Sequence, residues 1–467
     1  MSAAPALRCL LAGAALVGLF LSLGAGARPP LSGGDTTTNL INEDAFSLPA
    51  ANLSLVRRDG FFVGNSFFTN AWVSAPASTT ARDGLGPLFN TNTCQGCHLK
   101  DGRGRLPDAD EPLTSALVRI SLPNQHRESE AALRRDGVVP EPSYGGQIQN
   151  RALPGMRPEA RVRLRWEDID GEFADGTPYT LRRPVVTLTD LAYGPLHPDT
   201  RMSLRVAPPL IGMGLLEAIP EWRLEELADP HDDDGDLISG RLNRVWDRSA
   251  GSMASGRFGW KAGQPTVRQQ VAAAFSGDMG LTTGLYPEPP CSPAQRECLE
   301  APHGGDPEVE DPVLEVVAFY ARHLGVPPRR NHDGAAVRRG EELFRSAGCS
   351  ACHVETHRTG EVAGAPELSN QEIHPYTDLL LHEMGEGLAD GRTEFRANRR
   401  EWRTPPLWGI GLTEVVSRHT RFLHDGRARN LQEAILWHGG EARRSRQHFL
   451  QMERRERDHL LQFLQSL

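Results

Sequence analysis

The stretches that decide the fold are CQGCH at residues 94–98 and CSACH at residues 349–353. Each places two cysteines three positions apart, with a histidine directly after the second. Two thiols one helical turn apart can bond the vinyl groups of one porphyrin, and the next residue can place an imidazole over its iron. The sequence therefore predicts two covalently bound haem c groups, with His98 and His353 as proximal iron ligands. The expected haem-binding residues are Cys94, Cys97 and His98 for haem 1, and Cys349, Cys352 and His353 for haem 2.

Three other kinds of site also use paired cysteines. A single zinc ion held by both pairs would need ligands 255 positions apart (349 − 94), far beyond the usual spacing. Thioredoxin-like redox pairs follow a strand of a βαβ unit, and neither motif stands in a recognisable unit of that kind. Plain disulfides would leave both adjacent histidines unexplained. Haem attachment is the explanation that uses every part of the motifs.

The first 27 residues have the form of a secretory signal peptide. Arg8 precedes an apolar run that reaches Leu23, and residues 25–27 (Ala-Gly-Ala) offer a small-residue cleavage site. No later stretch approaches the roughly 18 consecutive apolar residues of a membrane helix. We expect a periplasmic protein without a membrane span in its mature form; an uncleaved N-terminal anchor is the alternative.

Composition narrows the classes of function. Of the 467 residues, 39% are hydrophobic and 24% are charged, which excludes a largely disordered chain. A formal net charge of −9 gives no reason to expect a nucleic acid as partner. Seven cysteines are too few for a disulfide scaffold of this length. Cys291 and Cys298 have no adjacent histidine, so we expect them to form a disulfide that closes a proline-rich loop.

An internal repeat relates the two halves of the chain. Residues 207–217 match residues 404–414, and residues 257–271 resemble residues 421–435 at an offset of 164 (435 − 271). From the first motif cysteine to the first of these segments takes 113 residues (207 − 94) in one half and 55 (404 − 349) in the other. The first copy therefore carries an insertion of about 58 residues.

The duplication predicts a mainly α fold of two cytochrome c-like helical domains with long loops. Residues 313–324 and 460–467 each show the apolar stripe of an amphipathic helix that closes one half. Residues 160–206 alternate apolar with polar side chains, so the insertion is expected to be a small β-rich unit. The expected organisation is a signal peptide at 1–27, a haem 1 domain at 28–328 and a haem 2 domain at 329–467.

These motifs resemble the di-haem oxidoreductase family, which is related to bacterial di-haem cytochrome c peroxidases. The resemblance covers most of the mature chain. It implies two helical cytochrome c domains, one that carries electrons and one that reacts with peroxide. Its most distinctive stretches are residues 89–90 with 94–104, 257–281, 375–391, 401–412 and 424–440.

The resemblance also indicates the distal ligand of haem 2. In the related peroxidases, the fourteenth residue after the histidine of a His-x-Gly segment ligates the electron-transfer haem, usually as methionine. Counted from His424, that residue is His438 here, so haem 2 is expected to have two histidine ligands. His382 and Met384 are rival ligands, and a surface histidine is the alternative for His438.

For haem 1 the repeat places Ala274 opposite His438 (274 + 164 = 438). Alanine cannot ligate iron, so haem 1 is expected to be five-coordinate and open to peroxide. Met279 is a weaker candidate as its distal ligand, and so is Met213. Methionine at such positions is more often part of a core.

Peroxide reduction also needs a group that moves a proton between the two oxygens. The sequence does not choose among the candidates, which are Asp101, His126, Glu217 and Asp278. Tryptophans suited either to electron relay or to a buried core are Trp72, Trp260 and Trp408. Arginines that could pair with haem propionates are Arg403, Arg418 and Arg421.

An acidic segment at residues 232–240 alternates carboxylates around Gly235, as calcium loops do. It departs from the EF-hand register, because Pro230 and Arg241 stand where acidic ligands belong. Related di-haem peroxidases hold calcium between their haems, so calcium is a candidate second cofactor; an exposed acidic turn is the alternative. The expected calcium ligands are Asp232, Asp234 and Asp236.

The motifs and the resemblance together predict an exported di-haem c-type oxidoreductase. The expected reaction is the reduction of hydrogen peroxide, with electrons from a soluble redox protein passing from haem 2 to haem 1. One alternative is a non-catalytic electron-transfer cytochrome with both irons six-coordinate. Another is an oxidase of an organic or protein substrate.

Overall fold

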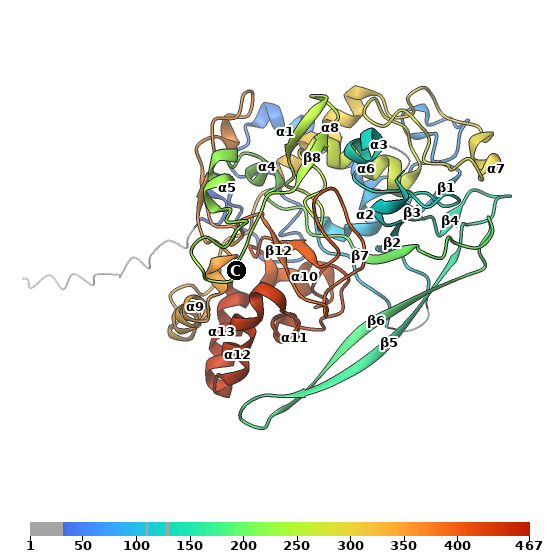
Figure 1. Cartoon of the computed structure of the whole chain (residues 1–467). Coiled ribbons are helices and arrows are strands. Elements are labelled where there is room, and N and C mark those ends of the chain that lie inside the picture. Colours follow the sequence, from blue (N-terminus) through green and yellow to red (C-terminus); the bar gives the residue numbers. More distant parts are fainter. Residues whose placement is uncertain (1–30, 109–110, 128–129) are drawn as a thin grey trace, which may run out of the picture.

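The computed structural model describes residues 31–108, 111–127 and 130–467 (Figure 1). The expected signal peptide at residues 1–27 lies outside the described residues. The α-helices are α1 (Leu55–Thr69), α2 (Cys94–Cys97), α3 (Glu130–Asp136), α4 (Met213–Glu217), α5 (Glu221–Leu227), α6 (Val267–Met279), α7 (Arg296–Leu299), α8 (Asp311–Arg322), α9 (Ala335–Ser346), α10 (Thr413–Ser417), α11 (Leu431–Leu436), α12 (Arg443–Gln451) and α13 (Arg454–Ser466). The strands are β1 (Leu88–Phe89), β2 (Ala116–Ser121), β3 (Gln147–Ile148), β4 (Arg151–Ala152), β5 (Arg161–Glu172), β6 (Pro178–Thr189), β7 (Arg201–Val206), β8 (Arg244–Asp247), β9 (Ser252–Ser255), β10 (His357–Arg358), β11 (Glu372–Ile373), β12 (Leu381–Glu383) and β13 (Glu401–Arg403).

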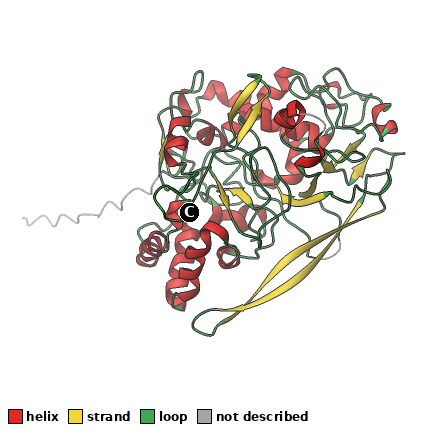
Figure 2. Ribbon diagram, in the orientation of Figure 1, coloured by secondary structure: helices red, strands yellow, loops and turns green. Residues whose placement is uncertain are grey.

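The expectation of a mainly α fold is wrong. Helices account for 31% of the chain and strands for 18%, and the strands of the described residues form six small sheets. Apart from β5 and β6, these strands are two to six residues long, too short to leave a periodic pattern in the sequence. Long loops connect the elements (Figure 2), and many of their side chains face a cavity rather than another helix.

Each half of the chain contains one close pair of helices with a glycine at the contact. In the first half α1 packs against α8, and a Cβ atom on Gly64 would lie 2.1 Å from the carbonyl oxygen of Val316. In the second half α9 packs against α13, and a Cβ atom on Gly340 would lie 2.0 Å from the carbonyl oxygen of His459. Any side chain at these glycines would push the helices apart, so glycine sets their separation.

The internal repeat is visible in local backbone geometry. At the offset of 164, both halves contain a short antiparallel bridge followed by a helix whose N-cap side chain accepts a backbone hydrogen bond. The bridges are Phe258–Gln264 and Phe422–Ala428, and the capping pairs are Gln269 with Thr266 and Glu433 with Asn430. The segments that match in sequence therefore share their local structure.

Within the insertion, β5 and β6 form one long antiparallel hairpin, which runs away from the main body to the C-terminal helices (Figure 1). At its tip the ring of Phe173 lies 6.0 Å from that of Phe449 in α12. Arg457 of α13 forms an ion pair with Asp175 at 2.8 Å. Strand β7, at the end of the expected β-rich unit, pairs instead with β2 in the three-stranded sheet β3-β2-β7. The hairpin ties the insertion to the last helices of the chain.

Two large hydrophobic clusters form most of the core, and each takes residues from both sides of position 328. Trp408 belongs to a cluster that is otherwise dominated by the first half, and Val118 shares a cluster with Phe463. The two halves therefore share their apolar cores, and the domain boundary at 328 stays a prediction. Among the described helices, none combines the length and apolar character needed to cross a membrane.

Candidate functional site

Both cysteine–histidine motifs open onto one cavity of about 1240 Å³. Pockets for one small ligand usually have volumes of about 300–1,000 Å³, so this cavity exceeds the needs of a single ligand. Its wall is mostly apolar, which suits a large planar ring system. All six predicted haem-binding residues line it: Cys94, Cys97, His98, Cys349, Cys352 and His353.

The first motif forms the single helical turn α2. The backbone N–H of His98 donates to the carbonyl oxygen of Cys94 at 3.0 Å, and its ring Nδ1 lies 2.8 Å from the carbonyl oxygen of Pro208. A carbonyl only accepts, so Nδ1 carries the proton and Nε2 keeps its lone pair. Burial lowers the pKa of His98 to about 4, which keeps the ring neutral at pH 7. This is the form of imidazole that ligates a metal through Nε2.

The second motif has the same local geometry, in a short 3-10 turn directly after α9. The backbone N–H of His353 donates to the carbonyl oxygen of Cys349 at 3.0 Å, and Nδ1 lies 3.0 Å from the carbonyl oxygen of Tyr376. Burial again lowers the pKa of this histidine to about 4. His353 is thus a second neutral imidazole with a free Nε2.

The four motif cysteines are free thiols. Burial raises the pKa of Cys94, Cys97 and Cys349 to about 12. In the part of the chain that the structure describes, Cys352 is the one motif cysteine that belongs to a cluster of three metal-ligating side chains. Haem attachment at these cysteines stays a prediction.

His438, the expected distal ligand of haem 2, also lines the cavity. Its Nδ1 donates to the carbonyl oxygen of Ala434 at 2.7 Å, so Nε2 is again free to bind a metal. Burial lowers the pKa of His438, and the proximity of His438 contributes to the low pKa of His353. The structure brings these two imidazoles to the same part of the cavity.

His382, the rival ligand, is held differently. Its Nε2 lies 2.8 Å from a carboxylate oxygen of Asp378 and its Nδ1 lies 2.6 Å from one of Glu441. Although burial lowers its pKa, the charge of Asp378 outweighs that effect, and the pKa of His382 is raised well above its usual value. A protonated ring with both nitrogens hydrogen-bonded has no lone pair for iron, so the geometry argues against His382 as a ligand.

The methionine candidates Met213, Met279 and Met384 all reach the cavity wall. So does Ala274, the residue that the repeat relates to His438. At positions that the repeat relates, the cavity wall thus contains a methyl group in one half of the chain and an imidazole in the other.

Of the four candidate acid–base groups, Asp278 is the carboxyl group on the cavity wall. Gln147 donates to its Oδ1 at 3.0 Å, and a guanidinium nitrogen of Arg119 lies 3.9 Å away. Burial raises the pKa of Asp278, and its charge raises the pKa of both Cys94 and Cys97. Asp278 therefore lies beside the first motif.

The other three candidates are engaged elsewhere. Asp101 accepts hydrogen bonds from the hydroxyls of Ser47 and Tyr320, and Glu217 forms an ion pair with Arg322 at 2.7 Å. Neither carboxyl group lines the cavity. His126 does line it, but its Nε2 contacts Asp199 at 2.9 Å.

Trp260 and Trp408 line the cavity, whereas Trp72 does not. Sequence reasoning missed Trp402, whose ring stacks on His424 with centroids 3.7 Å apart and also lines the cavity. Trp402 lies within the matched stretch 401–412, but nothing in the sequence indicates the stacking.

Of the arginines expected near propionates, Arg403 lines the cavity, and its guanidinium donates to the carbonyl oxygens of Gly259 and Thr404. Arg103 shares these features and was missed: it lines the cavity and donates to the carbonyl oxygens of Arg421 and Leu423. The remaining two are engaged at the surface, Arg418 with Glu43 and Arg421 with Asp108.

In the acidic loop, the carboxylates that gather are those of Asp229, Asp232 and Asp234, with ligand atoms within 4.8 Å of one another. Asp236 instead accepts a hydrogen bond from the backbone N–H of Ile238 at 2.8 Å. Asp229 was missed because it precedes Pro230, outside the alternating run. Calcium binding at this loop stays a prediction.

The comparisons with known proteins agree with this site. Residues 29–467 match the model of a family described as "Di-haem oxidoreductase, putative peroxidase". No curated protein and no solved structure matches the chain. Two neutral histidines with free Nε2 atoms, each beside a pair of free thiols on one oversized apolar cavity, fit two haem groups. The chain belongs to the di-haem oxidoreductase family.

Proposed function

We propose that this protein is an exported, periplasmic c-type di-haem oxidoreductase that reduces hydrogen peroxide. Haem 1 is attached to Cys94 and Cys97, and haem 2 to Cys349 and Cys352. The observation that carries the proposal is the asymmetry between Ala274 and His438, which stand at repeat-related positions on the cavity wall. The methyl group of Ala274 could not ligate an iron held by His98, whereas the imidazole of His438 could serve as second ligand to an iron held by His353.

The two haems, when bound, supply the path for electrons from haem 2 to haem 1 and the iron at which peroxide is reduced. The overall reaction consumes one peroxide, two electrons and two protons and yields two waters. A soluble redox protein supplies the electrons. The chain's own contribution is proton handling, positioning and exclusion of bulk water.

Asp278 is the proposed acid–base group for haem 1. Its carboxyl group would take the proton from one peroxide oxygen and return it to the other, which leaves as water. Burial raises its pKa, so the group can hold a proton nearer to neutral pH than an exposed aspartate can. Gln147 fixes the orientation of the carboxyl group through the hydrogen bond to Oδ1.

A purely electron-transferring protein is the second candidate, because Met279 also reaches the cavity wall and a thioether could close haem 1. The two candidates differ in peroxide turnover and in the effect of Asp278→Asn. For a peroxidase, this substitution should lower kcat about 10²- to 10⁴-fold.

The test uses the purified protein with its haems. We expect both haems to stay with the polypeptide after acid–acetone extraction, and we expect peroxide turnover with a reduced cytochrome as donor. Glu367→Gln is the matched control, because Glu367 is a buried carboxyl group that pairs with His323 and Arg57 and does not line the cavity; it should keep turnover near wild type. Loss of the haems on extraction would refute covalent attachment, and an inert protein with bound haems would favour the electron-transfer candidate.

A further inference from the structure

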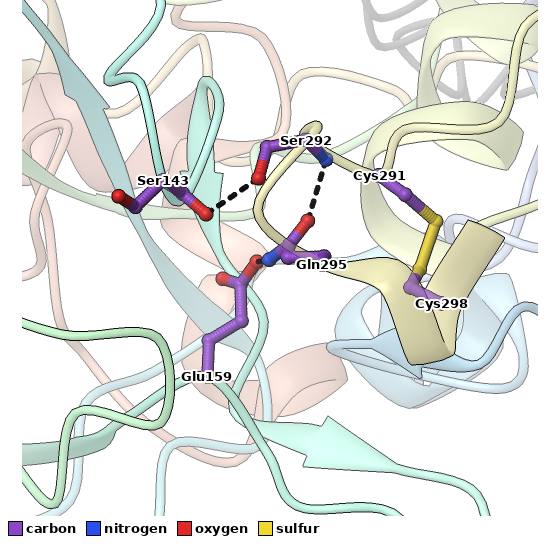
Figure 3. Close-up of a disulfide and its surroundings, with 6 residues drawn as sticks. All are labelled: Ser143, Glu159, Cys291, Ser292, Gln295 and Cys298. Carbon is purple, nitrogen blue, oxygen red and sulfur yellow. Dashed lines mark hydrogen bonds between the residues drawn. A yellow bond between two sulfur atoms is a disulfide. The ribbon is translucent and has the colours of Figure 1, made fainter.

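A disulfide joins Cys291 to Cys298 and closes a short loop (Figure 3). Residues 291–293 of this loop line the cavity, together with the two prolines at 289 and 290 that precede it. One hydrogen bond within the loop and one to a distant segment of the chain hold it in place. The backbone N–H of Ser292 donates to Oε1 of Gln295 at 2.6 Å, and the Ser292 hydroxyl donates to the carbonyl oxygen of Ser143 at 2.7 Å. The disulfide therefore constrains a segment that is also hydrogen-bonded to Ser143 of the same chain.

Gln295 links this loop to a buried carboxyl group. Its side chain is 0% exposed, and its Nε2 donates to Oε1 of Glu159 (Figure 3). The other oxygen of Glu159, Oε2, accepts the backbone N–H of Gln149 at 2.6 Å. Glu159 itself is 1% exposed. Two N–H donors, one on each oxygen, fix the plane of this carboxyl group.

The chain of hydrogen bonds continues to the end of α6. The side-chain Nε2 of Gln149 donates to the carbonyl oxygen of Gly277 at 2.7 Å. Nε2 of Gln147 lies 2.5 Å from Oδ1 of Asn90, 2.8 Å from the same carbonyl oxygen and 3.0 Å from Oδ1 of Asp278, so its two N–H groups are shared among three acceptors. Hydrogen bonds, joined by the covalent structure of Gln149, thus link the disulfide loop through Glu159 to the carboxyl group of Asp278. The path is buried at Gln295 and Glu159 and half-buried at Asp278.

We propose that Glu159 is a positioning residue for Asp278, and that the Cys291–Cys298 loop braces Glu159 from the other side. The inference rests on the proposed role of Asp278. Oε1 of Gln147 and Oε1 of Gln149 have no hydrogen-bond partner, but the NH₂ group of each side chain donates to the carbonyl oxygen of Gly277. Catalysis depends on holding the reacting group in place to within a fraction of an ångström, so these links can affect the position of Asp278. Glu159 sits at the centre of the path, so it determines where Gln149 and Gly277 lie, and with them Asp278.

The chemistry of the pair Glu159–Gln295 offers a sharp test. Glu159→Gln puts an NH₂ group against one of two N–H donors, so one hydrogen bond is lost. The double variant Glu159→Gln/Gln295→Glu restores both, because the new amide donates to the new carboxylate, which still accepts from Ser292. We expect kcat for peroxide to fall about tenfold or more in the single variant with less change in KM, and to recover to within about threefold in the swap.

A loss of stability alone would not show positioning, so the same substitution is also made in the Asp278→Asn background. If Glu159 acts through Asp278, Glu159→Gln should cost nothing further in kcat there. Equal losses in both backgrounds would overturn the proposal. Glu367→Gln is the control, because Glu367 is a buried carboxyl group paired with His323 and Arg57, away from this path; it should leave kcat unchanged.

Cyanide binding to ferric haem 1 gives a readout that does not need turnover. Hydrogen cyanide must lose its proton to bind, so a displaced Asp278 should raise the cyanide dissociation constant in Glu159→Gln and in Cys291→Ser/Cys298→Ser, with recovery in the swap. If Asp278→Asn alone leaves both cyanide binding and turnover unchanged, the proposed acid–base role fails and the inference fails with it. If Asp278→Asn weakens cyanide binding and Glu159→Gln does not, the positioning role alone is refuted. An unchanged cyanide dissociation constant in Cys291→Ser/Cys298→Ser would refute the proposed role of the disulfide loop in holding Glu159.

Discussion

At the scale of single residues, the hydrogen-bond partners of the ring nitrogens distinguish the candidate iron ligands among the histidines. His98, His353 and His438 each donate from Nδ1 to a backbone carbonyl and keep Nε2 free. His382 contacts carboxylates through both nitrogens. The sequence could not make this distinction, because one of those carboxylates, Glu441, stands 59 positions away from His382.

The distal ligand of haem 2 can be tested by substitution. In His438→Ala, ferric haem 2 should change from low spin to high spin, because the neutral imidazole opposite His353 is removed. Optical and EPR spectra of the ferric protein measure this change. Met384→Leu conserves volume at the other candidate position and should leave haem 2 low spin. An unchanged spectrum in His438→Ala would refute the assignment.

Glu159 should also be visible in the pH dependence of stability. Burial, the largest effect, raises its pKa to about 8, above the usual value of 4.5. Because the folded-state pKa exceeds the unfolded one, the stability that this group contributes is fully present below pH 4.5. It is lost as the pH rises towards 8.

We therefore expect wild type to lose stability relative to Glu159→Gln between pH 5 and pH 8, by an amount on the order of a few kcal/mol. Guanidinium unfolding of both proteins across this range measures the difference. Parallel pH curves would show that Glu159 is ionised in the folded protein throughout.

At the scale of elements, the alternating pattern of residues 160–206 correctly indicated strands but not their partners. β5 and β6 pair with each other, whereas β7 pairs with β2. Local alternation fixes which face of a strand is apolar, and the choice of partner depends on contacts distant in sequence. The contact of the hairpin tip with α12 and α13 also joins residues that are distant in sequence. Most strands are short and pair with residues that are distant in sequence, so they leave little periodicity in the sequence. For this reason the expectation of a mainly α fold is wrong.

The hairpin tip gives a prediction for stability. Phe173 is 3% exposed, its ring packs on those of Tyr179 and Phe449, and the guanidinium of Arg457 lies 4.0 Å from its centroid. Phe173→Ala should lower the free energy of unfolding by about 3–5 kcal/mol. Ile169→Ala, at a partly exposed site on the same hairpin, should cost within about 0.5 kcal/mol. Similar losses of unfolding free energy in both variants would show that the contact of Phe173 with Phe449 and Arg457 adds no particular stability.

At the scale of the whole molecule, the duplication visible in the sequence accounts for much of the site. Each copy carries one cysteine–histidine motif, and the repeat relates Ala274 to His438; both residues line the cavity, and their equivalence at the two haems stays a prediction. The duplication did not predict that the motifs share one cavity, nor that both hydrophobic clusters draw on both halves. Those features depend on how the two copies pack against each other. A sequence repeat predicts the local structure of each copy and not the contacts between copies.

The central claim is that the two haems differ in coordination, with haem 1 open and haem 2 closed by His438. EPR of the ferric protein, and of the protein after reduction of one haem, tests it most directly. We predict one high-spin ferric haem that binds cyanide and reacts with peroxide, alongside one low-spin haem with two histidine ligands. Two low-spin haems in every redox state, with no peroxide turnover, would contradict this account.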